Sequence, residues 1–171
     1  KAEDGLADNM VMSLLHDNSN RLWVGTMRRG LNLMQGMSGQ FEHFDYDRND
    51  PTSLSSNAVS SMLQDSQGRI WIATYGGGLV RLEVETETFS SYAPDPADER
   101  FWGHEWITAM LVDRSGMIWI GSHSEGLDRL DPATGQITAW KHDPNNPDGL
   151  GHDWITELVQ DRSGRIWIGT Y

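Results

Sequence analysis

Cysteine is absent from this 171-residue sequence, and so are long apolar runs. Without cysteine the chain has no disulfides, no cysteine-based zinc site and no cysteine nucleophile. The lack of cysteine is compatible with both the cytoplasm and the periplasm. No stretch of eighteen apolar residues occurs, so we expect no membrane-spanning helix among these residues. Cations are scarce, since 13 Lys and Arg stand against 25 Asp and Glu, which gives a formal net charge of -12. Such a charge repels polyanions, so we expect no nucleic-acid partner.

A tryptophan recurs every 48 residues, each time in a phrase close to Ile118-Trp119-Ile120-Gly121-Ser122. The four are Trp23, Trp71, Trp119 and Trp167. An Asp stands six residues before each one, at positions 17, 65, 113 and 161, and a Gly or Asn stands three before. Asp opening a tight turn, with Gly or Asn near its end, joins two antiparallel strands. We therefore expect turn-forming Asp residues, and Trp residues that pack sheet against sheet.

Each repeat predicts four short strands. An alternating apolar strand such as 59–63 comes first, the Trp strand second, a strand led by a Gly third, and a strand bearing aromatics such as 41–44 last. Four strands in a repeat of this length, with no helical periodicity, predict an all-β fold of the β-propeller type. We expect a propeller fragment of about three and a half four-stranded blades. The blades are predicted at approximately 9–50, 57–98 and 105–146, with a half-blade at 153–171.

The predicted ring is unfinished, because propellers generally close with four to eight blades. Either the chain is a piece of a longer protein, or several chains complete a ring together. Two copies would supply enough strands for seven blades, but both half-blades would contribute inner strands only. We therefore favour the first interpretation. The apolar edge at 166–168 also predicts self-association through the unfinished blade.

The repeat phrases are similar to those of a known family. The segments 53–59, 65–74 and 77–79 resemble the repeat of the two-component regulator propeller family, and the resemblance covers nearly the whole chain. It implies a periplasmic sensor region of an inner-membrane receptor, either a hybrid histidine kinase or a related receptor with a diguanylate cyclase output. Its partners would be a small ligand and neighbouring domains or subunits of the receptor. No kinase or cyclase motif is present, so we expect no enzyme activity and no cofactor; the alternatives are a protein-interaction scaffold and, less favoured, a propeller lyase or glycoside hydrolase.

On one rim of the predicted propeller, the four copies of the repeat differ in the residues that precede the inner strand. Copies one and two read Asn9-Met10-Val11 and Asn57-Ala58-Val59 at the entry to the inner strand, whereas copies three and four read His104-Glu105-Trp106 and His152-Asp153-Trp154. The Trp residues either fill space between blades while the His and acid cap strand ends, or form a stacking platform for a carbohydrate-like or aromatic ligand.

The loops after the Trp strands lie on the same rim. They add Arg28, Arg29, Tyr75, His123 and Glu125. Arg28 and Arg29 could attract an anionic ligand, or be a solvated loop pair. The candidate ligand-binding set is therefore His104, Glu105, Trp106, His152, Asp153, Trp154, Tyr75, His123, Arg28 and Arg29.

Metal and catalytic sites are weaker interpretations of the same rim. His104 and His152 occupy equivalent places beside Glu105 and Asp153, which would suit a shared metal or a pair of acid and base carboxylates. Side chains at equivalent positions need not converge, and both acids replace an Asn that is ordinary in the repeat. We predict neither a metal nor a catalytic residue.

Overall fold

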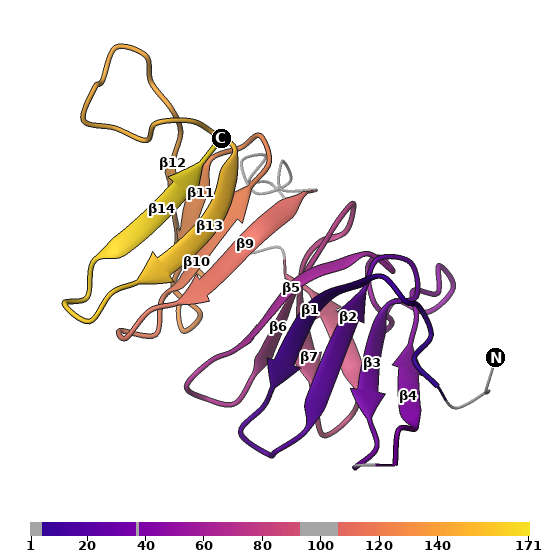
Figure 1. The fold of residues 1–171 in the computed structure, drawn as a ribbon. Helices are drawn as coiled ribbons and strands as arrows, with labels where there is room; N and C mark the ends of the chain where they lie inside the picture. The colour runs from indigo at the N-terminus through magenta and orange to yellow at the C-terminus, as the bar shows by residue number, and fades with distance from the viewer. Residues whose placement is uncertain (1–4, 37, 93–105) are drawn as a thin grey trace. The chain divides into compact units, whose positions relative to one another are not determined.

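The computed structural model describes residues 5–36, 38–92 and 106–171 (Figure 1). Over these residues the chain forms fourteen strands and no helix, so none of them belongs to a helix that could cross a membrane. The chain divides into two compact units, residues 1–92 and residues 93–171, and each is described by itself.

The four sheets are antiparallel, and within each sheet the strands pair in the order in which they follow one another along the chain. Blade 1 consists of β1 (Val11–His16), β2 (Leu22–Thr26), β3 (Leu31–Met34) and β4 (Phe41–Phe44). Blade 2 consists of β5 (Val59–Gln64), β6 (Ile70–Thr74), β7 (Gly78–Glu83) and β8 (Thr88–Ser91). Blade 3 consists of β9 (Ile107–Val112), β10 (Ile118–Ser122), β11 (Leu127–Leu130) and β12 (Ile137–Trp140). Half-blade 4 consists of β13 (Ile155–Gln160) and β14 (Ile166–Thr170). The predicted all-β propeller fragment of three and a half blades is confirmed.

The turn between the first two strands of each blade is held by its Asp. In blade 1, Oδ1 of Asp17 accepts hydrogen bonds from the backbone N–H groups of Ser19 and Arg21, both at 2.9 Å. Asn20 closes the turn with a φ of 64°, the left-handed conformation that Asn tolerates. The turn-forming role predicted for Asp is confirmed.

The same Asp also binds the repeated Trp, which the sequence did not reveal. Oδ2 of Asp17 accepts the indole N–H of Trp23 at 2.9 Å. The bond recurs in the other three repeats between Trp71 and Asp65 at 2.9 Å, Trp119 and Asp113 at 2.8 Å, and Trp167 and Asp161 at 3.0 Å. The carboxylate therefore ties the tight turn to the large ring that follows it.

Within each unit, one blade packs on the next through its Trp strand. Trp23 is buried in a core with Leu31 of its own blade and Val59 of blade 2. The inner strands β1 and β5 lie beside each other, as do β9 and β13 in the second unit. Gly25 permits this approach, because a Cβ there would lie 2.6 Å from Cγ1 of Val59.

Candidate ligand-binding surface

Two residues meet at one end of the inner strands in every repeat. One precedes the inner strand, the other follows the Trp strand, and a backbone hydrogen bond joins them. The N–H of His123 donates to the carbonyl of Trp106 at 3.0 Å, and the N–H of Tyr171 donates to the carbonyl of Trp154 at 3.1 Å. The equivalent pairs in the first unit are Met10 with Met27 and Ala58 with Tyr75. The fold thus places two side chains next to each other at the end of each blade.

In the second unit all four of these side chains are aromatic and form a continuous row. The ring centroids of Trp106 and His123 lie 5.8 Å apart, and those of His123 and Trp154 lie 4.3 Å apart. Trp154 and Tyr171 stack at 4.5 Å with an interplanar angle of 14°. Trp106 and Tyr171 are exposed large side chains, with 55% and 80% of their surface accessible. We call Trp106, His123, Trp154 and Tyr171 the aromatic row.

His152 adds a polar group beside the row. Its ring centroid lies 6.4 Å from that of Tyr171, and its Nδ1 accepts the backbone N–H of Trp154 at 2.9 Å. A ring nitrogen that accepts carries no proton, so the neutral imidazole holds its proton on Nε2. The exposed edge of His152 therefore offers a hydrogen-bond donor next to the end of the row.

Asp153 has a contact that belongs to the blade framework. Its Oδ1 accepts the backbone N–H of His142 at 2.6 Å, and its carbonyl accepts the N–H of Gly126 at 3.0 Å. Asn57 makes the same two bonds in the first unit, to Tyr46 at 2.6 Å and to Gly30 at 3.0 Å. The carboxylate of Asp153 thus holds the end of a blade as the amide of Asn57 does.

Glu125 forms an ion pair with Lys141 at 2.5 Å on the same end of the second unit. The hydrogen bond that Lys141 donates to Glu125 raises the pKa of Lys141, and the charges of Glu125 and Asp153 act in the same direction. The two charges neutralise each other at this position.

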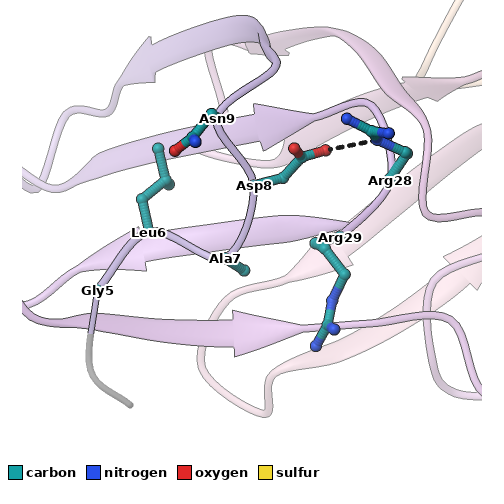
Figure 2. Close-up of a pocket in the computed structure, with 7 residues that line it drawn as sticks. All are labelled: Gly5, Leu6, Ala7, Asp8, Asn9, Arg28 and Arg29. Carbon is teal, nitrogen blue, oxygen red and sulfur yellow. Dashed lines mark hydrogen bonds and ion pairs between the residues drawn. The ribbon is translucent and has the colours of Figure 1, made fainter. Parts of the chain in front are cut away.

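In the first unit, Arg28 and Arg29 line a pocket of about 580 Å³ with Gly5, Leu6, Ala7, Asp8 and Asn9 (Figure 2). Figure 2 shows Arg28 directed toward Asp8, with 3.4 Å between Nε and Oδ2, while Arg29 extends away from that pair. Arg29 pairs with Asp45 at 3.1 Å. The hydrogen bond from the N–H of Met10 and the charge of Arg28 hold the pKa of Asp8 below its ordinary value. Each Arg thus has a carboxylate partner, and an anionic ligand would have to displace it.

The remaining candidates are distributed as follows. Tyr75 lies in the first unit, where its N–H donates to the carbonyl of Ala58 at 2.8 Å. His104 and Glu105 lie outside the described residues, so neither a shared metal nor an acid and base pair is described there. Among residues 5–36, 38–92 and 106–171, no group of three or more His, Asp or Glu could hold a metal ion.

Tyr171 is the one member of the aromatic row that is not among the residues predicted from the sequence, although it stands 48 residues after His123.

Comparison with protein families gives one match. The two-component regulator propeller model matches residues 5–28, 53–76 and 149–171. No curated protein matches the sequence.

Solved structures share the fold. The extracellular domain of a putative hybrid two-component system from Bacteroides thetaiotaomicron has a TM-score of 0.82 and 26% identity, over 99% of this chain and 23% of that one. The extracellular domain of a putative one-component system from the same organism has a TM-score of 0.79 and 24% identity, over 99% and 21%. Virginiamycin B lyase from Staphylococcus aureus has a TM-score of 0.66 at 10% identity, over 96% and 50%, which is a likeness of fold alone. The chain thus spans less than a quarter of the two extracellular domains.

Proposed function

Because its repeats belong to the two-component regulator propeller family, we propose that this chain is part of the periplasmic sensor region of a bacterial membrane receptor. It binds a ligand and does not catalyse a reaction. The proposal is supported by the similarity to extracellular domains of a putative hybrid two-component system and a putative one-component system. In this proposal other domains of the receptor carry the signal inward.

The aromatic row is the observation that carries the proposal. Exposed rings lose water readily and present flat apolar faces, on which the C–H face of a sugar or an aromatic ring can stack. Trp154 and Tyr171 stack on each other, and Trp106 at the other end of the row is more than half exposed, which leaves ring surface for a ligand. The Nε2–H of His152 beside Tyr171 would donate to a ligand hydroxyl. An oligosaccharide matches this combination of several rings in succession with a lateral donor.

The contacts of Asp153 support a binding role over a catalytic one. Of the two carboxylates that the sequence offers as acid and base, Asp153 already accepts a backbone hydrogen bond from His142 at 2.6 Å. A carboxylate committed to the framework cannot swing to a substrate without releasing the end of the blade. The likeness to a lyase concerns the fold and does not extend to its chemistry.

The test is calorimetric titration with a panel of neutral oligosaccharides. We expect Tyr171→Ala and Trp154→Ala each to weaken binding about tenfold or more, since each removes a stacking face. Tyr46→Ala is the matched control, because Tyr46 is an exposed aromatic of the first unit outside the row, and it should bind as the wild type does. Unchanged affinity in both row variants would overturn the site. If no oligosaccharide binds but a neighbouring receptor domain docks at the row, the chain is an interaction scaffold instead.

A further inference from the structure

A side-chain acceptor fixes the backbone of the residue that precedes the inner strand, and it stands two places earlier in the sequence. In blade 1, Oδ1 of Asp8 accepts the backbone N–H of Met10 at 3.2 Å. In blade 2, Oγ of Ser56 accepts the backbone N–H of Ala58 at 3.3 Å. Short polar side chains commonly bond the backbone two residues on in this way. We call this acceptor the cap of the inner strand.

His152 is the cap of half-blade 4, and its acceptor is a ring nitrogen. The backbone N–H of Trp154 donates to Nδ1 of His152 at 2.9 Å. The caps differ in how they respond to acid. The hydrogen bond from the N–H of Met10 holds the pKa of Asp8 below its ordinary value, so this carboxylate remains an acceptor at mildly acidic pH. An imidazole that takes up a second proton carries N–H donors on both nitrogens and accepts nothing.

The bond between His152 and Trp154 orients two parts of the ligand site. It holds the backbone of Trp154, whose ring centroid lies 4.5 Å from that of Tyr171 and 4.3 Å from that of His123. It also holds the ring of His152 itself, 6.4 Å from the ring of Tyr171, with Nε2–H as a donor beside the row. A proton on Nδ1 would point at the N–H of Trp154, so the two groups would have to move apart.

We propose, on the basis of the ligand site proposed above, that His152 is a pH-sensitive positioning residue of the aromatic row. Neutral His152 holds Trp154 in its stack with Tyr171. Protonated His152 releases Trp154 and turns its own Nε2–H away from the ligand. Histidine is the side chain that ordinarily changes charge between about pH 5 and 8. The row therefore binds its ligand at neutral pH and binds it more weakly as the medium becomes acidic.

The charged and titratable groups nearest to His152 in the sequence have contacts of their own. The carboxylate of Asp153 accepts the backbone N–H of His142 at 2.6 Å. Nδ1 of His142 donates to the carbonyl of Leu150 at 2.7 Å, and a second proton on that ring leaves this bond intact. Two further charged side chains at this end of the second unit, Glu125 and Lys141, form an ion pair with each other.

His123 is the titratable group that must be separated from His152, because its ring also contacts Trp154. The test therefore changes His152 and leaves His123 in place. His152→Ser copies the cap of blade 2, and His152→Asp copies the cap of blade 1, so both keep an acceptor for Trp154 at neutral and at mildly acidic pH. His152→Ala removes the acceptor at every pH.

The first measurement needs no ligand. NMR cross-relaxation between the ring protons of Trp154 and Tyr171 reports whether the two rings stack, at about pH 8 and about pH 5.5. We expect the wild type to lose most of this signal on acidification. His152→Ser and His152→Asp should keep it at both pH values, and His152→Ala should show the weak signal at both.

Two results of this measurement would overturn the proposal. The first is a wild type whose rings remain stacked at the acidic pH. The second is an equal loss in the wild type and in folded His152→Ser and His152→Asp, which would assign the effect to another group such as His123.

The second measurement is the affinity for the neutral oligosaccharide that binds tightest in the calorimetric panel, a ligand that does not itself titrate. We expect the wild-type affinity to fall about threefold to tenfold between the two pH values, which corresponds to one hydrogen bond. The affinity of His152→Ser should change less than about twofold. The same pH dependence in both proteins would overturn the proposed regulation. If no oligosaccharide binds, the proposed function fails, while the ring contacts of the free chain still decide the role of His152.

Discussion

Replacing Asp17 by alanine removes the group that ties the turn of blade 1 to its tryptophan. The carboxylate accepts four hydrogen bonds, from the N–H groups of Ser19 and Arg21 at 2.9 Å, from Nε of Arg21 at 2.7 Å and from Nε1 of Trp23 at 2.9 Å. Trp23 is buried, so its indole N–H would lose its acceptor without gaining water, at a cost of about 1–3 kcal/mol. The partly exposed pair with Arg21 adds at most about 1 kcal/mol. We therefore expect the free energy of unfolding of the first unit to fall by about 1–4 kcal/mol.

Asp161→Ala is the matched control. Asp161 accepts the same four bonds, from the N–H groups of Ser163 and Arg165, from Nε of Arg165 and from Nε1 of Trp167, and a fifth from the hydroxyl of Ser163 at 2.7 Å. Trp167 is more than half exposed, so water can take the place of the carboxylate. The loss of stability should be clearly smaller than for Asp17→Ala, although Asp161→Ala removes one hydrogen bond more.

Hydrogen–deuterium exchange read by mass spectrometry is the assay, because it reports separately on the β1–β2 and β13–β14 hairpins in a chain of two units. Urea unfolding followed by circular dichroism gives the total free energy. Equal losses in the two variants, or a loss below about 1 kcal/mol for Asp17→Ala, would refute the reasoning that burial of the indole decides the cost.

The remaining predictions concern acid, close packing and an exposed ion pair. Burial alone would raise the pKa of Asp17, but the hydrogen bonds from Trp23 and Arg21 outweigh it and hold the pKa below its ordinary value. The ionised Asp17 therefore stabilises the folded chain fully above about pH 4, and this stabilisation is lost as the pH falls through the lowered pKa of the folded state. A free energy of unfolding that does not fall between about pH 5 and about pH 2.5 would contradict this. Gly25→Ala should cost about 1–3 kcal/mol in urea unfolding, because its Cβ would collide with Val59, and an unchanged midpoint would be inconsistent with the close approach of β1 and β5. Arg29→Ala should change stability by less than about 1 kcal/mol, since its pair with Asp45 is exposed, and a larger loss in the same assay would show that the pair is more than a surface contact.

The strands and turns were predictable because each pattern occurs four times. One copy of an Asp six residues before a Trp says little, but four copies in phase identify the turn and the strand that follows. The hydrogen bond from Trp23 to Asp17 could not be foreseen, because residue spacing does not give the direction of an indole ring across a turn. The burial of Trp23 and the exposure of Trp167 also follow from neighbouring sheets, not from the identical phrases in which both residues occur.

The candidate site was predictable in part. Trp106 and Trp154 attracted attention because they replace Met10 and Ala58 of the earlier copies. The same spacing that placed Tyr75 and His123 on the rim leads to Tyr171, a signal that was present and not used. Asp153 could not be interpreted from sequence, since Asn and Asp offer the same Oδ1 acceptor to the backbone. Only the geometry separates a framework carboxylate from a reactive one.

The most direct test of the binding account is an NMR titration of the tryptophan indole N–H groups with the oligosaccharide that binds tightest in the calorimetric panel. The chain has eight tryptophans, and the four of the repeat donate their indole N–H groups to Asp17, Asp65, Asp113 and Asp161. The account predicts that the signals of Trp106 and Trp154 shift on saturation while those four stay in place. Shifts confined to the four repeat tryptophans, with Trp106 and Trp154 unchanged, would contradict it.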